Sequence, residues 1–324
     1  MADVAEPPAS AYVELQLFMP SAAYGFTKAP VVDAETGRPS YSETTESGTP
    51  YENTLVGVSD MDIFIFDMAG TYLGKVRDFS YVPVPGNPTY SYVTGQMPQS
   101  TFGKSVRLVL MANYAGRGVT LIEPGASSYK TWLPVNQFAY DNVWLPTDEL
   151  QHKYIPMSGE YHFSSSITAG QKYYGSISMQ RAVAKVRVKA GDNVSITAIQ
   201  VNGLQKRGFA LPQGQIAALQ GVTPQSVTVP LDAPLTKGTS AYFYLPEQPA
   251  RTTTLKLTFG DGTQHDVEFK NYRAEVTDPN TDHTYPIVRN YLYDYIISAK
   301  AGSDVDIRGN VLDWQWYDIT TDVE

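Results

Sequence analysis

Residues 12–19 read YVELQLFM, and in this run Glu14 and Gln16 alternate with apolar side chains. A period of two is typical of a strand that buries one face and leaves the other in water. We therefore expect this run to form the first strand of a sandwich and to close its core. The side chains on the apolar face are Val13, Leu15, Leu17 and Met19.

Short runs of the same kind recur along the rest of the chain. Gly (25 residues) and Pro (22 residues) separate them at short intervals, which disfavours long helices. The sequence Gly-Asp-Gly at 260–262 predicts a hairpin turn, and only 146–154 and 212–221 could supply a few helical turns. The chain is thus predicted to be all-β, built of antiparallel β-sandwiches. The clearest runs are MDIFIFD (61–67), VRLVLMAN (106–113), AVAKVRVKA (182–190), SAYFYL (240–245), TLKLTF (254–259) and HDVEF (265–269).

The length of 324 residues is about twice that of a usual single domain, so two domains are expected. The best boundary lies near TAGQKYYGSISMQ (168–180), after which RAVAKVRV (181–188) opens a new set of strands. We therefore predict a first domain at 1–178 and a second at 179–324.

The composition excludes several classes of protein. With a net charge of -9, the chain lacks the basic stripe that nucleic-acid binding requires. No run approaches the ~20 apolar residues of a membrane-spanning helix, and the absence of Cys excludes disulfides. Residues 1–10 lack the basic and apolar regions of a secretory signal, so we expect either a cytoplasmic protein or a trimmed mature form that begins with an added Met.

Catalytic and metal-binding motifs are not evident. The histidines at 152, 162, 265 and 283 lack metal-ligand spacing. The run DPNTDHTYPIVR (278–289) begins like a calcium loop, but it lacks the Gly at the sixth position and ends on Arg289, so it is interpreted as a turn. No nucleophile elbow, dinucleotide fingerprint or P-loop occurs. We expect no enzymatic activity and no cofactor.

The chain contains 23 tyrosines, and exposed tyrosine rings can stack on sugars. Many of them fall in strand runs, where packing in a core uses them equally well. A surface carbohydrate-binding sandwich is therefore kept as the rival interpretation.

In its order of strand motifs the chain resembles a family, the fimbrillins or type V pilins of Bacteroidales, of the FimA type. The resemblance covers most of the chain, and it implies two tandem transthyretin-like β-sandwiches. The motifs that carry it are YVELQLFMP (12–20), DIFIFDMAGTYLG (62–74), RLVLMAN (107–113), IPMSGEYHF (155–163), RAVAKVRV (181–188) and IVRNYLYDYII (287–297).

What the resemblance implies is a lipoprotein precursor exported to the outer membrane and the cell surface. A trypsin-like protease would cut in the loop after the first strand, and the groove left by that strand would accept a strand from a neighbouring subunit. The basic residue best placed for the cut is Lys28 in GFTKAP (25–30), and Arg38 fits less well because Pro39 follows it. The implied partners are other copies of the chain or related pilins, the maturation protease and a surface receptor. An anchor subunit that keeps its first strand is the alternative.

The donor strand would come from the end of the chain. Val305, Ile307 and Val311 share one parity, whereas Leu312 and the following tryptophans take the other, which predicts a bulge or bend near 309–311. Residues 304–308 could equally form an ordinary edge strand of the second domain. The donor side chains would be Val311, Leu312, Trp314 and Trp316.

Limited trypsin treatment is expected to cut first between Lys28 and Tyr51. The run VVDAETGRPSYSETTESGTP (31–50) is too long for a tight turn and has few side chains with which to pack, so we expect a mobile surface loop. Mass spectrometry of the earliest fragments gives the cut positions, and first cuts elsewhere in the chain would contradict the prediction.

Overall fold

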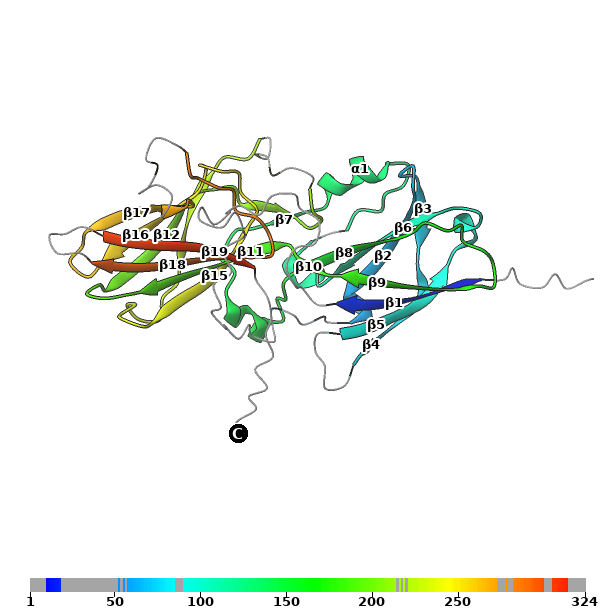
Figure 1. The fold of residues 1–324 in the computed structure, drawn as a ribbon, viewed down its shortest axis with the longest axis horizontal. Coiled ribbons are helices and arrows are strands. Elements are labelled where there is room, and N and C mark those ends of the chain that lie inside the picture. The colour runs from blue at the N-terminus through cyan, green and yellow to red at the C-terminus, as the bar shows by residue number, and fades with distance from the viewer. Residues whose placement is uncertain are drawn as a thin grey trace, which may run out of the picture.

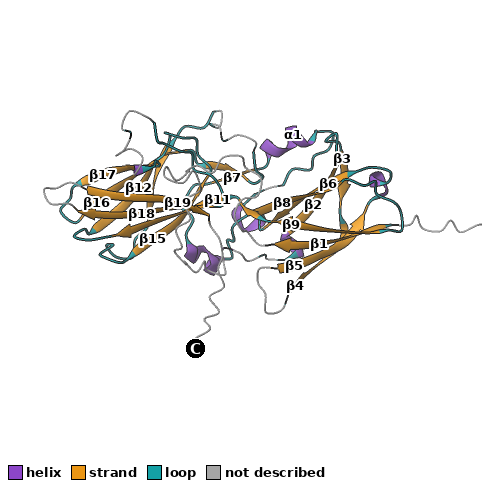
Figure 2. Cartoon of the chain, in the orientation of Figure 1, coloured by secondary structure: helices purple, strands orange, loops and turns teal. Residues whose placement is uncertain are grey.

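The computed structural model describes residues 10–18, 52, 55, 57–84, 90–119, 121–213, 216, 218, 221–272, 278, 282–299 and 305–313. Strands make up most of this part of the chain, and the helices in it are short (Figure 2). The prediction of an all-β fold is therefore confirmed. The strands form two sandwiches that lie side by side along the long axis of the molecule (Figure 1).

The first sandwich packs a four-stranded sheet against a five-stranded one. Its core is a cluster of buried apolar side chains contributed by both sheets, because the strands alternate inward and outward positions. The first sheet has the order β4 (Arg77–Pro83), β5 (Tyr90–Met97), β1 (Ala11–Phe18), β9 (Lys172–Ser178). The second has the order β10 (Gln180–Arg181), β8 (Met157–Phe163), β6 (Val106–Ala112), β2 (Met61–Asp67), β3 (Tyr72–Lys75).

The second sandwich has two four-stranded sheets. The predicted hairpin at 260–262 is confirmed, because β16 and β17 pair antiparallel around Gly262, whose φ of 84° favours glycine. One sheet has the order β15 (Ser240–Pro246), β11 (Val183–Ala190), β18 (Tyr291–Ala299), β19 (Val305–Asp313). The other has the order β14 (Gln225–Val229), β12 (Ile196–Leu204), β16 (Thr254–Phe259), β17 (Gln264–Glu268).

The two sandwiches repeat one arrangement of strands. In the first, β1 pairs antiparallel with β5 and parallel with β9. In the second, β11 pairs antiparallel with β15 and parallel with β18. The sheets are thus not purely antiparallel as predicted, since the opening strand of each sandwich lies parallel to a late one. Strand β19 lies beyond the repeated unit, because its position beside β18 has no counterpart beside β9 in the described part of the chain.

The connection between β6 and β8 covers the outer face of the five-stranded sheet. It contains helix α1 (Tyr129–Trp132), whose Trp132 ring lies 4.8 Å from that of Phe64 and 5.2 Å from that of Phe66. It also contains β7 (Gln137–Ala139), which pairs with β13 (Arg207–Phe209) of the second half and so joins the two sandwiches.

The remaining helices in the described part of the chain are short 3-10 helices of three to six residues. They are η2 (Val58–Asp60), η3 (Gln99–Thr101), η4 (Ala115–Arg117), η5 (Leu133–Val135) and η6 (Pro146–Gln151). The helical turns expected at 146–154 are found in η6, while those expected at 212–221 fall partly outside the described residues. No helix in the described part of the chain is long and apolar enough to cross a membrane.

The strands around residue 178 bear on the predicted domain boundary. Strand β9 ends at Ser178, but β10 still pairs with β8 of the first sandwich, and the second sandwich opens at Val183 in β11. The division into 1–178 and 179–324 stays a prediction.

Candidate strand-exchange site

The first strand, β1, lies inside its sheet rather than at its edge. Its residues pair with β5 from Ala11 to Phe18 on one side and with β9 from Tyr12 to Phe18 on the other. Removing it would therefore break two hydrogen-bonded ladders and divide the sheet into separate pieces. An extended segment of suitable register could restore both ladders.

The inward face of β1 is completely buried. Ala11, Leu15 and Leu17 are each 0% exposed and Val13 is 1% exposed. At about 1.5–3 kcal/mol for each larger side chain, burial of the valine and the two leucines contributes about 5–9 kcal/mol. This amount is comparable with the whole net stability of a domain. The expectation that this strand closes the first core is thus met for its described residues; Met19 lies outside them.

Glycines flank the inward positions of β1 on both sides. Gly95 pairs with Val13, and Gly175 pairs with Leu15. A Cβ atom at Gly95 would lie 2.4 Å from a Val76 methyl group, and one at Gly175 would lie 2.7 Å from the Tyr161 ring. Larger residues at these two positions would therefore collide with the core that borders the strand.

The sequence between β1 and Glu52 contains the predicted cleavage positions, Lys28 and Arg38, which lie outside the described residues. At its upstream end, the carbonyl oxygen of Phe18 accepts a hydrogen bond of 2.8 Å from the Met179 amide. This contact joins the end of β1 to the residue that follows β9. The chain is therefore hydrogen-bonded to the folded structure where it enters this segment, at Phe18, and it is held again where it leaves the segment, at Glu52.

The downstream tie is Glu52, which is 0% exposed. Its Oε1 atom lies 2.8 Å from the Lys185 Nζ atom of β11 and accepts a hydrogen bond of 2.6 Å from the Tyr244 hydroxyl of β15. Its carbonyl oxygen accepts a 2.9 Å hydrogen bond from Arg181 Nε. Burial lowers the pKa of the Arg181 guanidinium to about 10. Glu52 thus fastens the chain downstream of the predicted cut to the second sandwich.

Sequence reasoning missed Glu52 because it follows a polar run and carries no pattern of its own. A signal did exist in β11, where Lys185 and Arg187 occupy the same parity of an apolar strand. Buried cations require acidic partners, and the structure supplies Glu52 for the first and Asp294 for the second, at 2.6 Å from Arg187 Nε.

At the other end of the chain, residues 305–313 form the continuous edge strand β19. Its register with β18 runs without a shift from Tyr291 opposite Asp313 to Ala299 opposite Val305. The predicted bend at 309–311 is therefore wrong. The alternation continues through Gly309, where a Cβ atom would lie 3.0 Å from the Tyr295 ring, so a side chain at this inward position would crowd the ring.

The structure separates the predicted donor residues. Val311 lies opposite Tyr293 and is 6% exposed, so it belongs to the core of its own second sandwich. The backbone of Leu312 pairs with Leu292. Trp314 and Trp316 lie outside the described residues. Val311 is therefore not available to a neighbour unless β19 leaves β18.

The described residues contain no group of three or more His, Asp or Glu side chains placed to hold a metal ion. In the run 278–289, the Asp282 carboxylate accepts hydrogen bonds from Arg251 and from the Thr284 hydroxyl. The bond from the Arg251 guanidinium is the main reason that the pKa of Asp282 falls to about 2. Asn280 lies outside the described residues, and the interpretation of this run as a turn stays a prediction.

Comparison with known proteins places the chain among fimbrial proteins. The family described as fimbrillin-A associated anchor proteins Mfa1 and Mfa2 matches residues 56–320. That range begins after the first strand and covers the other strands of both sandwiches. No curated protein matches the chain at a significant level.

Several solved structures have the same fold. The tip fimbrial protein Mfa3 of Porphyromonas gingivalis, with a C-terminal truncation, is 14% identical with a TM-score of 0.55, over 94% of this chain and 100% of that chain. A putative cell adhesion protein of Parabacteroides distasonis is 13% identical with a TM-score of 0.56, over 95% of this chain and 98% of that one. One from Bacteroides uniformis is 13% identical with a TM-score of 0.50, over 83% and 96%. At these identities the likeness shows the fold alone.

Proposed function

Because the chain belongs to the family of fimbrillin-A associated anchor proteins Mfa1 and Mfa2, we propose that it is a non-enzymatic structural subunit of a cell-surface fimbria, joined to its neighbours by strand exchange. The family is fimbrial and adhesion-related, which points to the cell surface. Export as a lipoprotein precursor to the outer membrane is part of the same proposal.

The proposed sequence of events begins with a cut after Lys28, with Arg38 as the weaker candidate. The cut frees β1 from the rest of the chain, and β1 then leaves its place between β5 and β9. A strand from another copy, or from a related pilin, enters the groove and restores both ladders. A maturation protease and a surface receptor complete the set of partners.

One observation carries this proposal: β1 is an internal strand with a fully buried inward face. A single segment of chain links β1 to the strands that follow it in sequence. Loss of β1 would remove the stability of about 5–9 kcal/mol that burial of its apolar side chains contributes. Its replacement by a strand from a neighbour would recover that energy. The groove therefore favours tight and specific binding of a strand in which apolar residues alternate with polar ones.

The donor segment in this proposal lies after β19 and includes Trp314 and Trp316, the largest apolar side chains near the end of the chain. Val311 and Leu312 can join it only if β19 detaches from β18, because both residues pair with β18 and Val311 is packed in the core of the subunit that carries it. A truncation that tests donation should therefore begin after β19 rather than at Val311.

A chain that ends at Asp313 is expected to remain a folded monomer but to lose polymer formation after trypsin treatment. All of β19 is retained, so the midpoint of thermal unfolding should stay close to that of the full chain. The comparison is between polymers of the full and truncated chains by electron microscopy and size-exclusion chromatography. Equal polymer formation by the truncated chain would rule out donation through this terminus, whereas a lower unfolding temperature would show that the segment is part of the monomer's own core.

An anchor subunit that keeps its first strand is the second candidate, and the description of the matching family favours it. The two candidates differ in the amino terminus of the native protein. Amino-terminal sequencing of protein taken from the cell surface should start near Ala29 for a strand-exchanging subunit. A start upstream of β1 identifies the anchor.

A further inference from the structure

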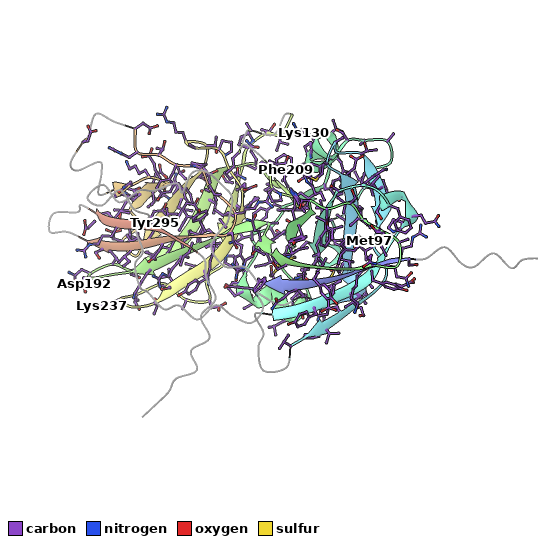
Figure 3. The ribbon with its side chains drawn as sticks, turned by 45° about the vertical axis from the view of Figure 1, so that its right-hand side comes forward. Met97, Lys130, Asp192, Phe209, Lys237 and Tyr295 are labelled. Carbon is purple, nitrogen blue, oxygen red and sulfur yellow. The ribbon has the colours of Figure 1, made fainter. Side chains whose placement is uncertain are left out.

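A cavity of about 440 Å³ opens at the end of the first sandwich that faces away from the second sandwich (Figure 1). It lies where β1 begins, β4 begins and β5 ends; Met97, in its wall, is labelled in Figure 3. Its lining includes Ser10, Arg77, Gln96, Met97, Gln99 and Phe102. We propose that this cavity and the sheet face beside it bind an oligosaccharide that carries a carboxylate group.

The charge of the cavity favours an anionic ligand. Arg77 is the one charged residue among the described lining residues, and no described carboxylate lies within ion-pair distance of it. A guanidinium recognises a carboxylate through paired hydrogen bonds. The net charge of -9 does not override this contact, because charges more than about 8 Å away are largely screened at physiological salt.

A β-bulge puts Arg77 in this position. The register of β4 with β5 shifts between Ser80, which lies opposite Thr94, and Arg77, which lies opposite Gln96. Asp78 takes up the extra residue with a φ of 46°. Regular pairing would have placed Asp78 opposite Gln96 instead. The bulge therefore substitutes a cation for an acid at the mouth of the cavity, and bulges are known to re-aim side chains in this way.

The sheet face next to the cavity offers exposed aromatic rings. Gln96 lies opposite Tyr12 of β1, which lies opposite Lys172 of β9, so the row from Arg77 crosses the sheet on one face. Tyr12 is 43% exposed, and Tyr174, diagonal to it on β9, is 63% exposed. Exposed tyrosine rings present apolar faces to the C–H groups of sugar rings and a hydroxyl to their oxygens.

The dimensions and the polar groups decide between a single sugar and a chain. Adjacent strands are about 4.8 Å apart, so the distance from β4 to β9 across the row is about 14 Å. A ligand that reaches from Arg77 to Tyr174 therefore needs several sugar rings. Gln96 in this row and Gln99 in the cavity wall supply amides that donate to and accept from hydroxyl groups. Lys172 of β9 also lies in this row, with its Nζ atom 5.9 Å from the centre of the Tyr174 ring. A hydroxyl-rich chain with an acid group at the Arg77 end matches this order, and Lys172 offers a second cation near the Tyr174 end.

Ser10 directly precedes β1 and Tyr12 lies within it, so this site includes the strand that strand exchange would remove. If the proposed function holds, the sugar site exists only in a subunit that keeps its first strand, such as an anchor or an uncleaved precursor. The site itself does not depend on that proposal, because the binding test below uses the uncleaved chain.

The test measures binding of two acidic probes, an oligogalacturonate and a sialylated lactose, to the full uncleaved chain by titration calorimetry. Each is compared with a neutral counterpart of the same length. We expect at least one acidic probe to bind, Arg77→Gln to weaken it tenfold or more without weakening the neutral counterpart, and Tyr174→Ala to weaken both. Arg207→Gln, which alters an exposed arginine of β13 in the second half, is the matched control and should leave binding unchanged.

Absence of binding by both acidic probes overturns the proposal, as does equal loss in the Arg77 and Arg207 variants, which would indicate attraction to any surface cation. Arg77 is exposed, so the variant should unfold at the same temperature as the original chain. Binding that survives removal of residues 1–28 by protease would show that β1 is not part of the site. Failure of strand exchange alone would leave binding to the uncleaved chain intact, so the two proposals can be judged separately.

Discussion

A chain that begins at residue 29, and so lacks β1, is expected to lose about 5–9 kcal/mol of stability from its first sandwich. The inward side chains of β1 are at most 1% exposed, so their loss opens the core to water along the whole groove. Since a domain is stable by only about 5–15 kcal/mol, the first sandwich should unfold at or below room temperature. The second sandwich should still unfold cooperatively, because its core contains no residue of β1. Differential scanning calorimetry measures both transitions.

The control for this truncation is the missing strand supplied as a peptide of residues 10–18. The peptide should restore the first transition, and a version with Leu15→Asp and Leu17→Asp should not, because buried carboxylates without partners are strongly unfavourable. Restoration by both peptides would mean that backbone pairing alone holds the strand. An unchanged first transition in the truncated chain would show that β1 contributes nothing essential to the core.

Replacing Glu52 by Ala is expected to lower the free energy of unfolding by about 3–5 kcal/mol. The change removes the carboxylate that lies 2.8 Å from Lys185 Nζ and leaves that ammonium group in a site where it is 6% exposed. The Tyr244 hydroxyl loses its acceptor as well. Because Glu52 joins the segment before β2 to the second sandwich, the loss should appear in denaturant unfolding as separation of the two halves into distinct transitions.

The matched comparison is the double variant Glu52→Met with Lys185→Met, which replaces the ion pair by apolar side chains of similar length. It should recover at least half of the lost stability, since apolar replacement of a whole buried pair is often neutral. Asp192→Ala is the second control: its 2.7 Å pair with Lys237 is exposed and lies at the far end of the second sandwich (Figure 3), so no measurable loss is expected. Equal losses in the single and double variants would mean that the ion pair is not the source of the stability.

The alternation of apolar residues predicted the strands because it reflects a local property, the period of two that places side chains on opposite faces. It identified β1 from Val13, Leu15 and Leu17 alone. The alternation does not predict which strands pair with each other. Strand β1, for example, lies parallel to β9 (Lys172–Ser178), which is far away in the sequence. No local pattern specifies such a pairing, so the parallel pairs could not be predicted.

The last strand shows a second limit. The change of apolar parity between Val311 and Leu312 predicts a bulge or bend, but the register of β19 with β18 continues through that point without a shift. The inward position at Gly309 is filled by the Tyr295 ring of the neighbouring strand rather than by its own side chain. The strand therefore keeps its regular alternation of inward and outward positions even where Gly309 provides no inward side chain. Only the contact with Tyr295 of the neighbouring strand reveals this.

The place of β1 between an antiparallel and a parallel partner has a mechanical consequence. Its hydrogen bonds run across the strand axis on both sides. A pull along that axis would load both ladders in shear, so that many bonds must fail together, whereas an edge strand pulled sideways peels away one bond at a time. If a donated strand occupies the same place, tension along the fibre would act on the junction in its strongest direction.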